Sequence, residues 1–219
     1  MDLADYCNAY NRVAKLAADN KWCAIHANLL DMYRAMVMMR PIPYVFVDLG
    51  VRSTEAFSSR VMLEVAELVA GNVYACDIAD CSNAIDAINN PRWHFHQGDA
   101  AEYASKFTGH ADVLCIDTTE KYEDTLGILT AWAPRMSDQS LTMLRCSNLG
   151  TSLAYENGER TGLGWDNARG VSLAIERFYG INLNEHQPSH SLVRRQHESL
   201  YITHYPWGGG LTMVGRFLE

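Results

Sequence analysis

Four aspartates each follow a short apolar segment, and together they suggest a ligand site. Each stands within two residues of the end of its segment, and they are Asp48, Asp77, Asp99 and Asp117. One such carboxylate would mean little, because aspartate is common in turns. If the segments are parallel strands, however, their carboxyl ends meet at one edge of a sheet, where small ligands bind. The spacing therefore predicts an acidic rim that faces a small polar ligand.

The elements that must position these acids alternate between strand and helix patterns. Short apolar runs predict strands over 44–49, 73–77, 93–97, 111–116 and 140–145. Three-to-four spacing of apolar residues predicts helices between them, over 55–69, 82–88, 101–107 and 122–132. This alternation is typical of a parallel sheet covered by helices on both faces, with the ligand near the point where the strand order reverses.

The two ends of the chain differ from this pattern. Residues 2–39 predict two helices, which either extend the packing over a sheet edge or cover the ligand pocket. After the alternating region we expect loops over 148–164 and 182–195, a helix over 166–179, and an antiparallel hairpin formed by 200–205 and 211–217. We expect residues 1–43 to be a helical cover and residues 44–219 to be one ligand-binding domain.

The loop after the first strand discriminates between nucleotide ligands. A dinucleotide site has the pattern G-x-G-x-x-G, which lets backbone amides approach a diphosphate. Here the loop reads Gly-Val-Arg-Ser-Thr, with Gly50 as its one glycine. The carboxylate of Asp48 would repel a diphosphate and suits an ammonium group, such as that of S-adenosylmethionine, unless it merely caps the next helix. Arg52 either binds the ligand carboxylate or braces the loop.

The later acids match the rest of such a ligand. Asp77, at the end of the second strand, would accept hydrogen bonds from the two ribose hydroxyls, although this holds for NAD as well. Asp99, after Gly98, would contact the adenine amino group, and the backbone amide of Ala100 would face the same ring. Glu123 and Asp124 either hold a cationic acceptor or simply favour the first turn of a helix.

Several segments resemble class I S-adenosylmethionine-dependent methyltransferases, of the cephalosporin-hydroxylase-like and sugar O-methyltransferase type found in natural-product pathways. They are FVDLGVRST, VYACDIADC, WHFHQGDA, ADVLCIDTTEKYEDTLGILTAWAPRM, WDNARGVSLAIERFYG and YITHYPWGGGLTMVGRF. The resemblance covers roughly residues 44–217. It implies a Rossmann-like α/β fold with a seven-stranded, mostly parallel sheet and an antiparallel C-terminal hairpin strand. It also implies S-adenosylmethionine as methyl donor, S-adenosylhomocysteine as product, and a small-molecule acceptor such as a sugar, an aminoglycoside or another natural product.

On these segments we expect ten residues to bind the cofactor: Asp48, Gly50, Arg52, Ser53, Asp77, Ile78, Gly98, Asp99, Ala100 and Asp117. The reaction would be directed to oxygen or nitrogen. The acceptor proton would be handled by Asp117, Glu120 or a nearby histidine, for which we select His204. A packed side chain is the alternative for His204.

Two positions depart from the family pattern. The end of the fifth strand reads Arg145-Cys146 where the family usually has a histidine and an aspartate, and Glu120 stands where relatives carry a histidine. A divalent metal ion needs several converging oxygen ligands. Because the partner on the fifth strand is missing, we expect no metal site and an enzyme that works without a metal ion.

Composition narrows the remaining classes. The 219 residues carry a net charge of -8, which disfavours a nucleic acid as main partner. No apolar run reaches the roughly 20 residues that span a bilayer, and the first residues are acidic rather than basic like a secretory signal. We expect a cytoplasmic protein with no membrane partner, and a homodimer stays open. An NAD(P)-dependent oxidoreductase and a non-catalytic nucleoside-binding protein of the same fold are the alternatives.

Overall fold

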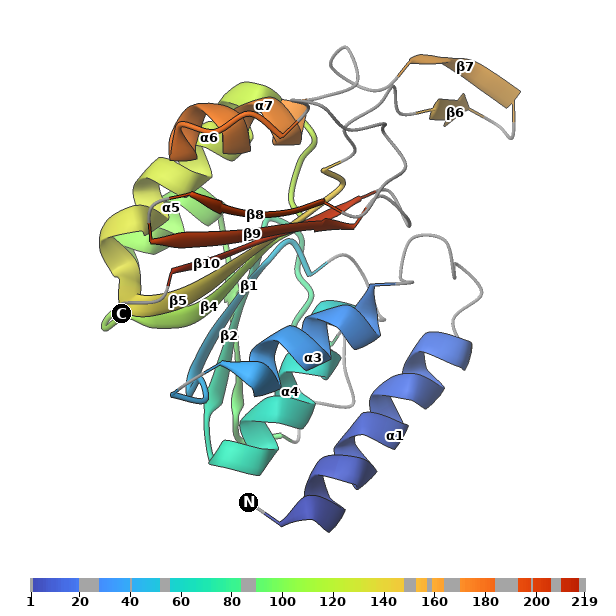
Figure 1. The fold of residues 1–219 in the computed structure, drawn as a ribbon, viewed down its shortest axis with the longest axis vertical. Coiled ribbons are helices and arrows are strands. Elements are labelled where there is room, and N and C mark those ends of the chain that lie inside the picture. Colours follow the sequence, from blue (N-terminus) through green and yellow to red (C-terminus); the bar gives the residue numbers. More distant parts are fainter. Residues whose placement is uncertain are drawn as a thin grey trace.

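An eight-stranded mixed sheet forms the centre of the molecule (Figure 1). The computed structural model describes residues 2–19, 28–39, 41–51, 56–83, 90–147, 153–156, 159–163, 170–183, 193–197, 199–205 and 210–216. The strands are β1 (Val45–Leu49), β2 (Asn72–Asp77), β3 (Trp93–Gln97), β4 (Ala111–Ile116), β5 (Met136–Arg145), β8 (Val193–His197), β9 (Leu200–Tyr205) and β10 (Leu211–Arg216). Their order across the sheet is β3-β2-β1-β4-β5-β10-β9-β8.

The strand pairing confirms the predicted Rossmann-like fold. The strand β1 is parallel to both β2 and β4, and the neighbouring pairs β2–β3 and β4–β5 are also parallel. The C-terminal strand β10 lies antiparallel between β5 and β9. Because the chain leaves β1 toward β2 and later returns on its other side with β4, the strand order reverses between β1 and β4. Ligands of such sheets bind outside the carboxyl ends of the strands at this point.

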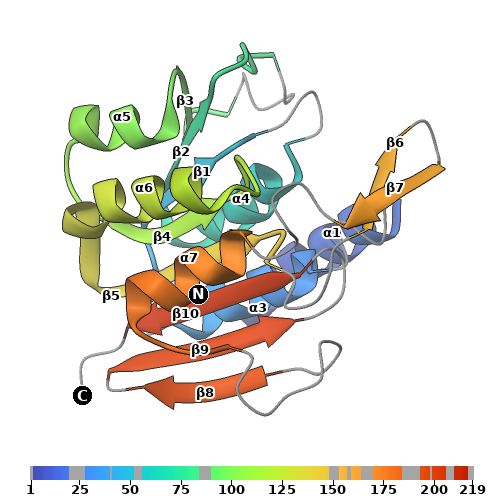
Figure 2. The ribbon, with the colours of Figure 1, turned by 90° about the horizontal axis from the view of Figure 1, so that it is seen from above.

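Three strands were not predicted. β8 begins in the predicted loop 182–195, ends two residues beyond it, and adds an eighth, antiparallel strand next to β9, as Figure 2 shows. Its sequence, VRRQH, has no apolar alternation, and an edge strand can be held by backbone hydrogen bonds to one neighbour alone. β6 (Leu153–Glu156) and β7 (Glu159–Leu163) form a separate antiparallel pair within the predicted loop 148–164. Both are too short to show a period of two in the sequence.

Helices cover both faces of the sheet (Figure 1). α1 (Leu3–Asp19), α3 (Leu29–Met38) and α4 (Phe57–Val69) lie on one face; α5 (Ala100–Lys106), α6 (Tyr122–Trp132) and α7 (Gly170–Tyr179) lie on the other, and a short 3₁₀ helix, Ala133–Arg135, follows α6. Strand side chains alternate between the two cores, so that Phe46 faces α4 and Val47 faces α5 and α6. Most of the predicted helix 82–88 lies outside the described residues.

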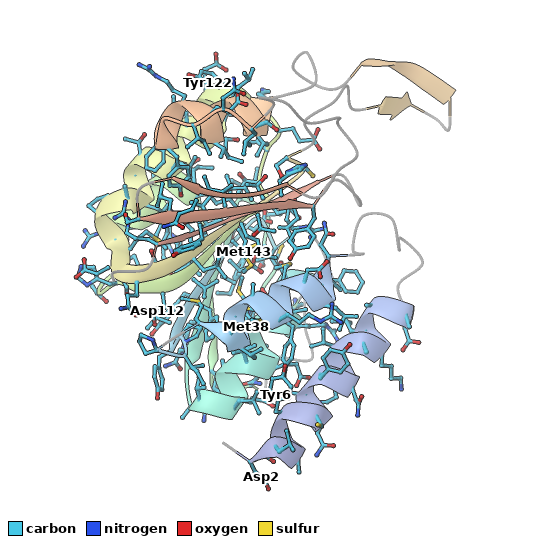
Figure 3. The ribbon with its side chains drawn as sticks, viewed as in Figure 1. Asp2, Tyr6, Met38, Asp112, Tyr122 and Met143 are labelled. Atoms are coloured by element: carbon cyan, nitrogen blue, oxygen red, sulfur yellow. The ribbon has the colours of Figure 1, made fainter. Side chains whose placement is uncertain are left out.

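The N-terminal helices pack on α4 rather than over the carboxyl ends of the strands. Tyr6 of α1 turns toward α3, where its ring centroid lies 5.8 Å from that of Tyr33, and Met38 and Met143 lie on this side of the sheet (Figure 3). At the amino ends of the strands, both oxygens of Asp112 are bonded, since Oδ2 accepts from the backbone of β1 and Oδ1 accepts from Ser137. No helix among the described residues is long and apolar enough to cross a membrane.

Candidate active site

A cavity of about 500 Å³ opens at the carboxyl ends of β1, β2, β3 and β4. Its volume falls within the usual range of small-molecule sites. It is lined by Gly50, Cys76, Asp77, Ile78, Gly98, Asp99, Ala100, Ala101, Asp117, Thr118, Thr119, Glu123, Asp124, Gly127 and Ile128. Parallel strands of matched register bring together residues far apart in the sequence, and so the predicted positions Gly50, Asp77, Ile78, Gly98, Asp99, Ala100 and Asp117 all meet here.

Gly50 sits where the ends of β1 and β4 approach most closely. Its φ of +89° lies in the left-handed region that favours glycine. A Cβ at this position would lie 2.3 Å from the carbonyl oxygen of Asp117. The backbone hydrogen bonds from Gly50 N to Cys76 O and from Asp117 N to Leu49 O, both 2.8 Å, extend the sheet pairing to the rim. A glycine is therefore required for the shape of this loop.

Asp48 lies beneath the cavity and does not line it. Its side chain is fully buried, and Oδ2 accepts hydrogen bonds from the hydroxyls of Ser58 and Ser59 in the first turn of α4. Burial raises the pKa of Asp48 to about 6. The carboxylate is thus bonded by side chains of α4, whose N-cap residue is Ala56. Its predicted contact with a cofactor stays a prediction, and Arg52 and Ser53 lie outside the described residues.

Asp77 and Asp99 stand on the cavity wall with one oxygen of each already in a local hydrogen bond. Asp77 Oδ1 accepts from the amide of Ala79 at 2.9 Å. Asp99 Oδ1 accepts from the amides of Ala101 and Glu102 at 2.8 and 2.9 Å and so forms the N-cap of α5. These bonds fix the direction of both carboxylates, which is a requirement for recognising a ligand with defined donors.

An ion pair joins the ends of β4 and β5. Arg145 Nη1 lies 2.9 Å from Asp117 Oδ2, and the two side chains are only 5% and 9% exposed. Cys146, at a φ of +56°, points its thiol at Asp117 Oδ1 over 3.8 Å, and burial raises the pKa of that thiol. Glu120, in the loop after β4, is half-buried and does not line the cavity.

Arg145 had no predicted role. The sequence shows one sign of its importance, because a single arginine ends the mostly apolar run LTMLR. Its position beside Asp117 is set by the register of β4 and β5 in the folded sheet. The sequence pattern also did not place Thr118, Thr119, Gly127 and Ile128 at the site, and it left Glu123 and Asp124 open. Thr118 and Thr119 lie between β4 and α6, and the other four residues lie in the first two turns of α6.

His204 is buried away from the cavity wall. On β9 its Nδ1 pairs with Thr212 Oγ1 at 2.9 Å, and Thr212 in turn donates to Ser147 Oγ at 2.8 Å. Within the described part of the chain Nε2 has no hydrogen-bond partner, and burial lowers the pKa of His204 to about 4. The imidazole is therefore neutral at pH 7 and a weak proton acceptor. Its catalytic role stays a prediction.

The charge of the cavity wall has one sign. Five carboxylates line it, those of Asp77, Asp99, Asp117, Glu123 and Asp124, and the described lining contains no lysine, arginine or histidine. Across residues 2–216, where described, no three histidine, cysteine or acidic side chains form a group that could hold a metal ion. The arrangement suits a cationic ligand that also presents hydrogen-bond donors to the strand ends.

Residues 47–144 match the family model described as a methyltransferase domain. The match covers 98 of the 219 residues and supports a methyltransferase domain in this part of the chain. The match runs from β1 to the end of β5 and so contains every described residue that lines the cavity. The match supports the class I methyltransferase prediction, whereas the natural-product subtype stays a prediction. None of the curated proteins matches the chain in sequence.

Solved structures share the fold of this chain. A protein from Corynebacterium glutamicum aligns with a TM-score of 0.60 and 14% identity, over 97% of this chain and 91% of its own. The Podospora anserina methyltransferase PaMTH1, solved with S-adenosylhomocysteine bound, aligns with a TM-score of 0.61 and 12% identity, over 100% and 89%. MycE is a mycinamycin-pathway methyltransferase solved with Mg, S-adenosylhomocysteine and mycinamycin VI. It aligns with a TM-score of 0.50 and 16% identity, over 87% of this chain and 48% of its own. At these identities the similarity establishes the fold.

Proposed function

We propose that this protein transfers the methyl group of S-adenosylmethionine to a hydroxyl or amine of a small molecule. The charge of the cavity carries the proposal, because its described wall presents five carboxylates and no basic side chain. S-adenosylmethionine has two positive groups, the sulfonium and the ammonium, against one carboxylate. A wall of this sign attracts such a ligand and repels anionic ones.

A nicotinamide dinucleotide is a poor match for the same wall. Its diphosphate would have to lie at the end of β1, where Asp117 faces the cavity and where Gly50 is followed by no second glycine in a G-x-G pattern. Two phosphate charges beside these carboxylates would be unfavourable. The oxidoreductase alternative is therefore weaker than the methyltransferase.

Each part of the cofactor has a matching part of the rim. We infer that Asp77 accepts hydrogen bonds from the ribose hydroxyls and that the segment 98–100 holds the adenine. The loop that begins at Gly50, with Arg52 and Ser53, would hold the methionine end. Asp48, which is buried next to the last residue of β1, would act through its charge, since it does not line the cavity.

The chain must align an acceptor and remove its proton. When bound, S-adenosylmethionine supplies an electrophilic methyl group, which the acceptor lone pair attacks as the sulfur leaves as a neutral thioether. Alignment of this kind can lower the barrier by several kcal/mol. A hydroxyl acceptor also needs a general base. We assign this role first to Glu120, because Asp117 is already paired with Arg145 and His204 is buried with a lowered pKa.

We propose a sugar or amino-sugar natural product as the acceptor and a reaction that needs no metal ion. The acids Glu123 and Asp124 on the wall favour an acceptor with an amine. MycE, which shares the fold, was solved with mycinamycin VI and Mg bound. In this chain, however, both oxygens of Asp117 already contact groups at the end of β5. A metal ion at Asp117 would have to displace Arg145.

Calorimetric titration with S-adenosylmethionine, S-adenosylhomocysteine and NADH tests the proposal. We expect binding of the first two and none of NADH. Binding of NADH without binding of S-adenosylhomocysteine would refute the methyltransferase assignment. A non-catalytic nucleoside-binding protein of the same fold would bind S-adenosylhomocysteine and produce none of it from S-adenosylmethionine with any amine or sugar acceptor.

A further inference from the structure

We propose that Arg145 is a positioning residue of the methyl-transfer site, in which it acts as the buried counter-ion shared by Asp117 and Asp48. It touches no ligand itself and works through the carboxylate of Asp117, which lines the cavity. The inference rests on the proposed function, since it concerns how the cofactor wall is held.

The position of Arg145 follows from the sheet. Strands β4 and β5 are parallel with Ile116 level with Leu144, so the next residue of each strand, Asp117 and Arg145, stand side by side at the rim. Their charged groups meet at 2.9 Å with side chains 9% and 5% exposed. Because water is nearly excluded, this pair is not screened by salt as a surface pair would be, and removing one partner leaves an uncompensated charge.

The second oxygen of Asp117 is held from the same strand end. Cys146 adopts a φ of +56°, an unfavourable conformation for a residue with a side chain. This conformation directs the thiol toward Asp117 Oδ1 at 3.8 Å. A strained backbone persists where its surroundings determine it strongly, often at functional sites. Asp117 is thus fixed through Oδ2 by a guanidinium and through Oδ1 by a thiol.

Arg145 also balances the charge of Asp48. The hydroxyls of Ser58 and Ser59 on α4 bond Asp48 directly. The charged groups that act on it are the carboxylate of Asp117, just after β4, and the guanidinium of Arg145 on β5, and the thiol of Cys115 on β4 bonds to it. Among these, Arg145 is the cation. Burial and Asp117 raise the pKa of Asp48, whereas the two serines and Arg145 lower it. Without Arg145, two neighbouring carboxylates would lie buried together and one would tend to take up a proton.

The loss of Arg145 would change the cavity wall that faces the ligand. Asp117 meets Gly50 through its backbone, and the same residue lines the cavity. If the guanidinium were lost, Asp117 could rotate or become neutral, and the cavity would lose an oriented anion beside the first loop. Arg145 therefore determines both the direction and the charge of this wall.

A double-mutant cycle tests the proposal with S-adenosylhomocysteine as probe. The variants are Arg145→Met, Asp117→Asn and the combination, with Arg145→Lys to keep the charge without the planar fork. Arg135→Met is the matched control. Arg135, in the 3₁₀ helix, donates a hydrogen bond to the carbonyl oxygen of Ala104 and does not line the cavity. Affinity is measured by calorimetry across pH, and thermal unfolding of each variant is measured in parallel.

If Arg145 acts through Asp117, Arg145→Met weakens binding by about 30-fold or more in the wild-type background and by less than about 3-fold when Asp117 is already asparagine. Arg145→Lys stays within about 10-fold of wild type. The pH at which affinity falls on acidification also moves upward in Arg145→Met, which a purely structural role would not cause. Arg135→Met binds as the wild type does.

Equal losses of affinity in both backgrounds, or an unchanged pH dependence in Arg145→Met, overturn the inference. If Arg145→Met does not fold, the Lys variant and the double variant decide, because removing both charges relieves the uncompensated carboxylate. If the double variant regains both the stability and the affinity of the wild type, the positioning role is refuted, because binding would then not need the carboxylate of Asp117. Failure of the wild type and of Arg135→Met to bind S-adenosylhomocysteine would instead overturn the proposed function.

Discussion

Replacing Gly50 by alanine tests whether the ends of β1 and β4 form one tightly packed wall. The φ of +89° costs an alanine about 1–2 kcal/mol. Its methyl group would also lie 2.3 Å from the carbonyl oxygen of Asp117 and 2.8 Å from the amide nitrogen of Thr118. Backbone atoms cannot rotate away, and such overpacking costs about 1–3 kcal/mol. We expect Gly50→Ala to lower the free energy of unfolding by about 2–5 kcal/mol, the sum of these two costs.

Two other glycines separate the causes. Gly109 has a φ of +106° with nothing within 4 Å of an added Cβ, so Gly109→Ala should lose only the conformational cost of about 1–2 kcal/mol. Gly127 lies within α6 with similar open space, so Gly127→Ala should gain up to about 1 kcal/mol from helix propensity. The measurement is urea unfolding at 25 °C, with calorimetric titration of S-adenosylhomocysteine alongside.

Affinity gives the second criterion. Because Gly50 and Asp117 both line the cavity, moving the β4 loop should weaken S-adenosylhomocysteine binding by about 10-fold or more in Gly50→Ala. Gly109→Ala, which is remote from the cavity, should bind as the wild type does. If Gly50→Ala loses no more stability than Gly109→Ala and keeps its affinity, the close approach of the two strand ends is wrong.

Three further predictions concern cofactor affinity, the effect of removing metal ions, and the dependence of stability on pH. Asp77→Ala should weaken S-adenosylhomocysteine binding by 10-fold or more, about 1.4 kcal/mol, and unchanged affinity would remove the ribose assignment. EDTA should leave the formation of S-adenosylhomocysteine intact, and a full loss restored by magnesium would contradict the metal-free proposal. Lowering the pH should show the effect of His204 on stability, because its pKa is lowered from 6.5 to about 4 in the folded protein. Below pH 6.5 the unfolded chain binds a proton that the folded chain refuses, so His204 reduces stability progressively down to pH 4, by about 3 kcal/mol. Asp48, with a pKa raised to about 6, acts in the opposite direction. The measurement is therefore the difference in unfolding free energy between wild type and His204→Asn at pH 7 and pH 4.5, and a difference that does not change with pH would show that His204 titrates normally.

Much of the rim could be predicted from the sequence alone. Asp77, Gly98, Asp99 and Asp117 stand at the ends of short apolar runs, and such runs specify strands through local side-chain patterns. Parallel pairing then places their carboxyl ends at one edge with no further information. The cap formed by Asp99 is likewise local, because it depends on residues within three positions.

The tertiary structure decided what each carboxylate faces. The sequence could not show that Asp48 is buried against α4 and bonded by Ser58 and Ser59. Nor could it show that Arg145 pairs with Asp117 between the ends of the neighbouring strands β5 and β4. It also missed the edge strand β8, since a polar strand held by one neighbour carries no hydrophobic period. Local pattern specifies where a strand ends and which residue ends it. Burial, charge pairing and edge pairing depend on which distant segments pack together, and that is settled only when the sheet and its helices are assembled.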